Sequence, residues 1–243
     1  MDVSTSIGPQ FQESTKYHRG RPVPQVPGWA APPDTYKVYE DYLERVALPE
    51  PQSGGTPLWD AIEGRRSERR FSGEPLTQQE ISQLLWATQG LTGGVGGIDL
   101  RASASAGALY PNETYVVAQA IEGVTAGVYH YDIRAHELGM LAEGDYSEDL
   151  ARACLEQTWT QRAGAVFVWG AVVARCAWKY QNRAYRYLYL DAGHIGGQLQ
   201  LAAQALGLGS CNIAAFFDNE VAKLVGIDGL TEVPVYVTAV GRA

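Results

Sequence analysis

The chain has 243 residues, of which 46% are hydrophobic, and it carries a formal net charge of −8 with a pI near 5.0. This composition predicts a globular protein with a substantial core, and its acidity argues against a general nucleic-acid surface, whose affinity comes from neutralising phosphates. No apolar run approaches the roughly 20 residues of a membrane span, and the amino terminus lacks a signal-peptide core, so we expect a cytoplasmic protein with no membrane partner.

Residues 1–55 are predicted to form an extended amino-terminal arm. Eight of the twelve prolines lie here, and proline fixes φ and removes a backbone donor. We expect at most one short helix in the arm, over 36–46. Aromatic side chains, among them Trp29, are too numerous for a free tail, so the arm should lie over the main body or over a partner subunit. Ser53-Gly54-Gly55 marks the boundary with a second unit, residues 56–243.

A helix and a basic run follow this boundary. Thr56 and Pro57 suit a helix start, and an apolar stripe is expected at Leu58, Trp59 and Ile62. The run GRRSERRF, residues 64–71, then concentrates four arginines in an acidic chain. Arginine's planar fork suits phosphate, although an isolated basic run is more often a solvated helix end.

A second helix is predicted over 77–89, because Thr77 and Glu80 form a capping-box pair and Gly90 follows the last apolar position. Residues 91–112, rich in Gly, Ala and Ser, are predicted to be a loop. They contain neither GxxxxGK[ST] nor GxGxxG, so they predict no P-loop and no dinucleotide turn. Their small residues suit a backbone that approaches a flat ligand; the alternative is a mobile surface loop.

The remaining chain alternates strands and helices. We expect strands over 113–121, 128–131, 138–141, 163–173, 210–216 and 233–240 and helices over 146–157 and 219–225, the last capped by Asp218 or Asn219. A long helix includes 188–206, where apolar residues recur at spacings of four and three, and Gly207 follows it as a C-cap glycine.

Three glycines interrupt the long helix. Gly193, Gly196 and Gly197 should each cost about 1 kcal/mol relative to alanine in a helix interior. Gly193 and Gly197 lie one turn apart, so they predict a strip against which another backbone packs closely. The neighbour is either an element of the same chain or a second subunit, and the sequence favours neither.

The cysteines and histidines predict neither a disulfide framework nor a metal site. The three cysteines are odd in number and form no CxxC, and the four histidines form no HExxH. We expect His194 and Cys211 to be buried packing residues.

Four motifs in this order resemble the flavin-dependent nitroreductase family: GRRSERRF, SASAGALYP, ALGLGS and the terminal Val240-Gly241-Arg242. The resemblance covers roughly residues 56–243. The segments FQESTKYHR, SASAGALYP and KYQNRAYRY further resemble its thiazoline/oxazoline dehydrogenase branch, whose members oxidise azoline rings to azoles during maturation of streptolysin-like peptides. The resemblance implies an α+β, nitroreductase-like fold with a central, mostly antiparallel sheet flanked by helices, and a homodimer with FMN at the subunit interface.

The resemblance also implies a flavin site. Arg65 and Arg242 would bind the FMN phosphate, Ser67 the ribityl chain, and Arg69 the ring near N1 and O2, where a cation stabilises the anionic reduced flavin. FMN is expected rather than FAD because nothing suggests an adenine site. The other implied cofactor-binding residues are Arg66 in the basic run, Ser103, Ser105, Gly107, Ala108 and Leu109 in the loop, and Gly207, Gly209 and Ser210 after the long helix.

Lys179 and Tyr180 match the Lys-Tyr pair of the azoline dehydrogenases. Removing a proton from a carbon beside a C=N bond, while hydride leaves to the flavin, needs a base, and a lysine serves if burial lowers its pKa. Tyr180 would position or protonate a ring atom. The alternative is an exposed lysine beside a packing tyrosine.

Three functions are therefore expected, in this order. The first is an FMN-dependent oxidation of an azoline-like small molecule or peptide. The second is an NAD(P)H-dependent reduction of nitro or quinone compounds. The third, of another class, is a non-catalytic flavin-binding scaffold subunit of a peptide-modifying complex.

Overall fold

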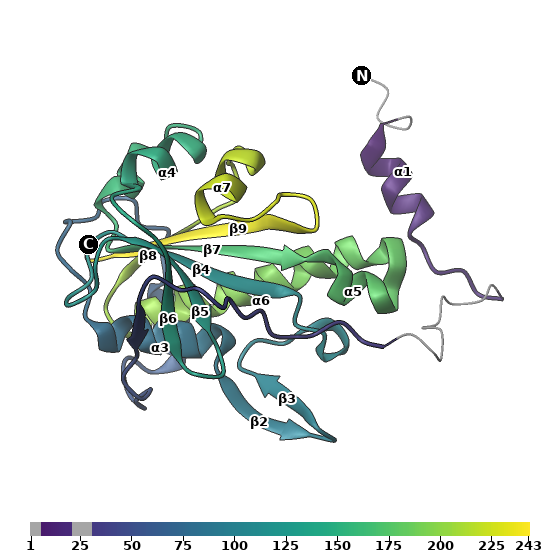
Figure 1. The fold of residues 1–243 in the computed structure, drawn as a ribbon, viewed down its shortest axis with the longest axis horizontal. Coiled ribbons are helices and arrows are strands. Elements are labelled where there is room, and N and C mark those ends of the chain that lie inside the picture. Colours follow the sequence, from purple (N-terminus) through teal and green to yellow (C-terminus); the bar gives the residue numbers. More distant parts are fainter. Residues whose placement is uncertain (1–5, 21–30) are drawn as a thin grey trace.

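A seven-stranded sheet organises the computed structural model, which describes residues 6–20 and 31–243 (Figure 1). Its strand order is β1-β6-β5-β4-β7-β9-β8, and every neighbouring pair in this order is antiparallel. The strands are β1 (Arg45–Ala47), β4 (Asn112–Ala118), β5 (Gly127–Asp132), β6 (Glu137–Glu143), β7 (Ala165–Val172), β8 (Gly209–Ile213) and β9 (Glu232–Gly241). The expected α+β fold with a mostly antiparallel sheet is confirmed.

Helices cover both faces of this sheet (Figure 1). On one face lie α3 (Gln78–Gln89) and α6 (Ala184–Ala205), and on the other lie α4 (Ser147–Ala153) and α7 (Asp218–Val225). The central strand β7 is buried from Ala165 to Ala171, as its nearly continuous apolar sequence predicts. Alternate residues of β7 serve the two cores: Trp169 packs with α6, and Val168 packs with α7.

Local sequence signals mark the start of α3 and the end of α6. The Thr77 hydroxyl accepts from the Glu80 amide at 3.2 Å, and the Glu80 carboxylate accepts from the Thr77 amide at 2.8 Å, which completes the expected capping box. Gly207 follows α6 with φ +74°, a conformation that favours glycine. The expected cap of α7 is wrong: Phe217 precedes the helix, and Asp218 lies in its first turn, where a carboxylate still favours the helix dipole.

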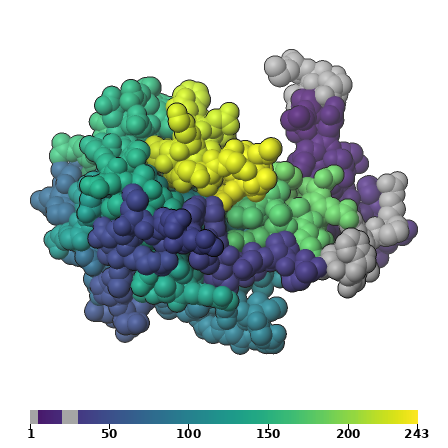
Figure 2. Space-filling view, in the orientation of Figure 1, coloured from purple at the N-terminus to yellow at the C-terminus, as the bar shows by residue number. Residues whose placement is uncertain are grey.

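The arm differs from its expected form. Residues 36–46 form no helix; they run extended across the sheet into β1 (Figure 2). The reason is side-chain bonding to the sheet, because the Tyr42 hydroxyl meets His130 Nδ1 at 2.8 Å and Lys37 Nζ donates to the Tyr115 hydroxyl at 2.8 Å. The helix of the arm is instead α1 (Ile7–Ser14). Trp29 lies outside the described residues.

Three further expectations are corrected. Residues 91–101 are a hairpin, β2 (Leu91–Val95) and β3 (Ile98–Arg101), whose turn residues Gly96 and Gly97 have positive φ as a tight hairpin turn requires. The helix expected over 146–157 ends at Ala153, and a 3₁₀ turn follows at Thr158–Arg162. The strand expected over 210–216 is shorter, since β8 ends at Ile213.

The first helix of the main body presents its apolar side chains to solvent. In α2 (Leu58–Gly64), Leu58 is 58% exposed, Trp59 77% and Ile62 47%, and Ala61 alone in the helix is buried. The expected apolar stripe therefore faces away from the core of its own chain. Besides these elements the chain has α5 (Val173–Tyr180), which continues directly from β7.

Candidate functional site

The arginine run lies against the edge of the sheet. Ser67 forms a parallel bridge with Ser210 of β8, and the Glu68 amide donates to the Ser210 carbonyl at 3.0 Å. The Ser72 amide donates to the Arg242 carbonyl at 2.9 Å. The basic run, the start of β8 and the end of β9 therefore meet at one end of the sheet, although they lie far apart in sequence. Gly209 belongs here too, since a Cβ on it would meet the Glu68 side chain at 3.0 Å.

Three arginines of the run have no ion-pair partner among the described residues. Arg65 is half-buried, whereas Arg66 and Arg69 are exposed. Arg66 donates to the backbone carbonyls of Glu63 and Arg65, and Arg69 lies over the Trp159 ring with its guanidinium carbon 5.9 Å from the centroid. These uncompensated guanidinium groups suit an anionic ligand.

Arg242 behaves differently from the rest of the implied phosphate site. Its Nη2 lies 3.0 Å from Glu80 Oε2, and its Nε donates to the Pro75 carbonyl at 3.1 Å. Its guanidinium is therefore directed to the amino-terminal end of α3, and only its backbone joins the arginine run.

The loop that carries SASAGALYP runs along α6. The Ser103 amide donates to the Thr88 carbonyl at 3.2 Å, and its hydroxyl donates to Gln198 of α6. Ser105 donates from its hydroxyl to Asp191 Oδ2 at 2.6 Å, about two turns further toward the start of α6. The loop closes in a 3₁₀ turn at Ala106–Ala108, after which Leu109 is buried.

Lys179 and Tyr180 meet this loop at Gly107. Both residues are half-buried at the end of α5. A Cβ placed on Gly107 would lie 2.6 Å from the Tyr180 hydroxyl and 2.9 Å from Lys179 Nζ, so a side chain there would displace one of them. The Tyr180 ring also lies 4.5 Å from the Tyr187 ring, and burial raises the pKa of Tyr180. The structure therefore brings the implied catalytic pair and the implied ring-binding loop into contact.

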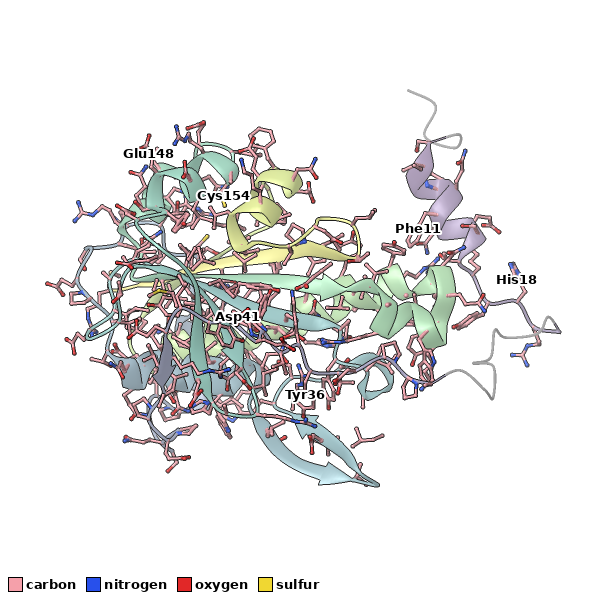
Figure 3. All side chains as sticks on the ribbon, viewed as in Figure 1. Phe11, His18, Tyr36, Asp41, Glu148 and Cys154 are labelled. Atoms are coloured by element: carbon pink, nitrogen blue, oxygen red, sulfur yellow. The ribbon has the colours of Figure 1, made fainter. Side chains whose placement is uncertain are left out.

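The arm reaches the same region through α1. Arg183 donates to the Thr15 carbonyl at 2.6 Å, Arg186 donates to the Gln12 carbonyl at 2.6 Å, and the Arg186 guanidinium carbon lies 5.8 Å from the centre of the Phe11 ring (Figure 3). The segments FQESTKYHR and KYQNRAYRY, which resemble the same branch, are thus spatial neighbours.

Asp191 was missed by sequence reasoning. It is buried on α6, and burial raises the pKa of its carboxyl while hydrogen bonds from Ser105 and Ala106 oppose that rise. The signal that points to it is a carboxylate at a position of α6 whose neighbours one turn away, Leu188 and Ile195, are buried and apolar.

Of the two residues that were expected to be buried, Cys211 and His194, only Cys211 is. Cys211 is buried, and burial raises the pKa of its thiol. His194 is exposed, because its position on α6 faces away from the sheet; its Nδ1 lies 3.3 Å from the Ala104 carbonyl. Among residues 6–20 and 31–243, no group of three or more His, Cys, Asp or Glu has an arrangement that would hold a metal ion.

The two parts of the implied site lie toward opposite ends of α6. This 22-residue helix is roughly 33 Å long at 1.5 Å per residue. Its first turns lie beside α5, whereas its last turn receives the Thr56 amide on the Ala205 carbonyl at 3.0 Å and lies close to Gly64, where the arginine run begins. Gly207 and Gly209 belong to this second end.

The three glycines of α6 have different neighbours. A Cβ on Gly196 would meet the Tyr236 ring of β9 at 2.6 Å, so this glycine admits a strand of its own chain. Gly193 and Gly197 have nothing within 4 Å of such a Cβ. Tyr185 and Tyr189 continue the same exposed row at spacings of four.

A groove of about 530 Å³ lies on the other face of the sheet, between α4, α7 and strands β5 and β6. Its lining contains none of the implied site residues. Within the part of the chain that the structure describes, no helix is both long and apolar enough to cross a membrane.

Comparisons with known proteins identify similar sequences and structures. The model of the family described as "Nitroreductase family" matches residues 62–242. The Methanocaldococcus jannaschii protein MJ1384, named after the nitroreductases, is 35% identical over 185 residues, which are 76% of this chain and 90% of that protein.

Two further relatives are named for peptide processing. The trifolitoxin-processing protein TfxB of Rhizobium leguminosarum is 31% identical over 137 residues, which are 54% of this chain and only 37% of TfxB. A chain in the structure of the E. coli microcin synthetase McbBCD complex with truncated pro-MccB17 bound matches with a TM-score of 0.62 and 22% identity, covering 97% of this chain and 86% of that one. At this identity the second likeness shows the fold alone.

Proposed function

The chain belongs to the nitroreductase family, and we propose that it is an FMN-dependent oxidoreductase that oxidises an azoline-like ring, in a small molecule or peptide, to an azole. The observation that carries the proposal is the contact of Lys179 and Tyr180 with Gly107 of the SASAGALYP loop, which supports pairing the implied base with the implied ring-binding loop. The likeness to TfxB, a protein named for toxin processing, supports a peptide as substrate.

The residues at the arginine run fit an FMN phosphate. Arg65, Arg66 and Arg69 supply charged donors without carboxylate partners among the described residues, and Ser67 adds a hydroxyl beside them. We assign the phosphate to Arg65, the ribityl chain to Ser67 and the ring edge to Arg69. Arg242 would bind the phosphate only if its guanidinium were shared between the phosphate and Glu80.

The chemistry divides between the cofactor and the chain. FMN, when bound, would supply the hydride acceptor. Lys179 Nζ would remove the proton from the ring carbon beside the C=N bond, so that the ring loses a proton to lysine and a hydride to the cofactor and gains one double bond. The Tyr180 hydroxyl, which lies beside Gly107 together with Lys179, would hold the ring heteroatom in place.

A homodimer would complete this site. The two parts of the site lie toward opposite ends of α6, and its exposed row at Gly193 and Gly197 suits close packing against a second copy. If two α6 helices cross in antiparallel orientation at these glycines, the arginine run of one copy approaches the Lys179 end of its partner. The exposed apolar side chains of α2 would flank the same contact.

One alternative is favoured by a specific observation. The microcin B17-processing protein McbC of E. coli is 29% identical over 144 residues, and this relative favours a subunit that acts within a peptide-modifying assembly. A scaffold that only binds flavin and an active dehydrogenase differ in whether substrate reduces the flavin under nitrogen. Consumption of NAD(P)H by the purified protein would instead favour a nitro or quinone reductase.

The test of the proposed function is flavin binding. We expect the purified protein to be yellow and to release FMN on denaturation. Arg65→Ala should weaken FMN binding by about 1.5 to 3 kcal/mol, the contribution of a charge-assisted hydrogen bond. Arg70→Ala is the matched control, because Arg70 is almost fully exposed and pairs with Glu68. Equal FMN affinities in the two variants would remove the arginine run from the phosphate site.

A further inference from the structure

Asp191 differs from the other buried carboxylates because its two oxygens accept hydrogen bonds from two different donors of one turn of the chain, residues 105–110. Its Oδ2 accepts from the Ser105 hydroxyl at 2.6 Å, and its Oδ1 accepts from the Ala106 amide at 3.2 Å. The Ser105 oxygen in turn accepts from the Tyr110 amide at 2.9 Å. One carboxylate on α6 thus holds the beginning of the 105–110 turn directly and its end through a hydroxyl.

The turn needs such a restraint because its backbone is strained. Gly107 has φ +67°, Ala108 +55° and Tyr110 +43°, and the last two carry side chains that disfavour this region. Strained residues keep their conformation only where surrounding contacts impose it. From α6 the turn receives the hydrogen bonds to Asp191, and its Leu109 packs in an apolar cluster with Ala184 and Leu188.

The turn is also the surface against which the catalytic pair packs. At Gly107 the Tyr180 hydroxyl and Lys179 Nζ approach so closely that no Cβ fits between them and the backbone. If the turn relaxed toward negative φ, Gly107 would move and both side chains would lose this contact.

We propose that Asp191 is a positioning residue, which holds the 105–110 turn in the conformation that places Lys179 and Tyr180. The role of the pair rests on the proposed function, but the bracing of the turn does not. No contact with flavin or substrate is assigned to Asp191.

The first experiment measures hydrogen exchange in the flavin-free protein. Asp191→Asn removes the charge and leaves one acceptor oxygen, so its NH2 faces one of the two donors that the carboxylate accepted. Exchange at the Ala106 and Tyr110 amides should therefore accelerate by about 10- to 100-fold, the factor that corresponds to one charge-assisted hydrogen bond. Asp218→Asn, the same change at an exposed carboxylate, should leave both amides unchanged. Ser105→Ala should accelerate Tyr110 exchange, and Ser105→Thr, which keeps the hydroxyl, should restore it.

The second experiment measures Lys179 itself. Amidination of Lys179 by methyl acetimidate, followed by mass spectrometry, should accelerate in Asp191→Asn and in Ser105→Ala but not in Ser105→Thr. Wild-type exchange at Ala106 and Tyr110 in Asp191→Asn would overturn the bracing. Faster exchange with an unchanged amidination rate would overturn the positioning of the pair.

Activity separates this inference from the proposed function. With an azoline peptide as substrate, Asp191→Asn should lower kcat at least about tenfold, while the FMN dissociation constant stays within about twofold. The loss should be smaller than the roughly 10² to 10⁴ expected when a general base is removed, because Lys179 is still present. A wild-type kcat in this variant would overturn the positioning role. A protein that binds no FMN would overturn the proposed function, and the two flavin-free measurements would still decide the inference.

Discussion

At the scale of single residues, Lys179 and Tyr180 are placed by a neighbour distant in sequence. Gly107, the distant neighbour, lies against both, and the nearby Tyr187 ring is tilted by 57° against the Tyr180 ring with centres 4.5 Å apart. Lys179 is only half-buried, and its Nζ lies against the turn at Gly107, so under the proposed function a substrate would meet a base restrained by that turn. A general base needs this combination of access and fixed geometry.

We expect Lys179→Ala to lower turnover of an azoline substrate by about 10² to 10⁴, the usual contribution of general acid–base catalysis. Tyr180→Phe should lose less, because it removes a hydrogen bond and keeps the ring. Flavin reduction under nitrogen measures both, and FMN affinity should not change. Lys223→Ala, on α7 across the sheet, is the control. Flavin reduction at the wild-type rate in Lys179→Ala would make Lys179 structural.

At the scale of elements, the Glu113 carboxylate on β4 binds side chains of β5 and α5. His130 Nε2 on β5 lies 2.9 Å from its Oε2, and Arg175 Nη1 on α5 lies 2.5 Å from its Oε1. The arm is included, because Tyr42 bonds the other nitrogen of His130. Burial opposes ionisation of Glu113, but the hydrogen bond with His130 and the charge of Arg175 outweigh it and lower the pKa to about 2.

Glu113→Gln should lower the free energy of unfolding by about 3 to 5 kcal/mol, because it leaves the buried charge of Arg175 without its partner. The native pKa lies below the unfolded value of about 4.3, so the carboxylate stabilises the fold above pH 4.3 and this stabilisation is lost as the pH falls toward 2. Urea denaturation across this pH window should therefore show that the free energy of unfolding falls less in Glu113→Gln than in the wild type.

Glu122→Gln makes the matched comparison for this effect, because it is the same substitution at an exposed position. Its free energy of unfolding should stay within about 0.5 kcal/mol of the wild type, as surface changes usually do. If the two variants were equally stable, the Glu113 network would not stabilise the fold.

At the scale of the whole molecule, two exposed surfaces adjoin. The row of α6 at Tyr185, Tyr189, Gly193 and Gly197 has no covering side chains at its glycines among the described residues. The exposed apolar residues of α2 lie beside the last turn of the same helix. Exposed apolar side chains beside a helix row without covering side chains are typical of an interface between subunits.

We expect a homodimer of about twice 26.4 kDa by light scattering at micromolar concentration. Gly197→Leu should shift it toward monomer and weaken FMN binding, because a leucine does not fit where two backbones touch. Glu220→Leu places the same side chain on α7, on the other face of the sheet, and should leave the mass unchanged. A native monomer that retains flavin would contradict both the interface and the composite site.

The sequence by itself determined the features whose causes are local. The Thr77–Glu80 capping box, the apolar run of β7 and the three- and four-residue spacing of α6 each depend on residues within a few positions of one another. The order of the motifs was enough to identify the family, because each motif is a short stretch of neighbouring residues along the chain. The hairpin at 91–101 escaped this reasoning, since its glycines also suit a loop.

Only the tertiary structure decided which of these residues meet. Ser105 and Asp191 are 86 positions apart, and Arg242 and Glu80 are 162 apart, so neither contact leaves a trace in local spacing. The arm is extended because Lys37 and Tyr42 bond to strands that the sheet assembles beside them. Long-range partners depend on the path of the whole chain, because burial and charge compensation are settled only when distant segments pack together.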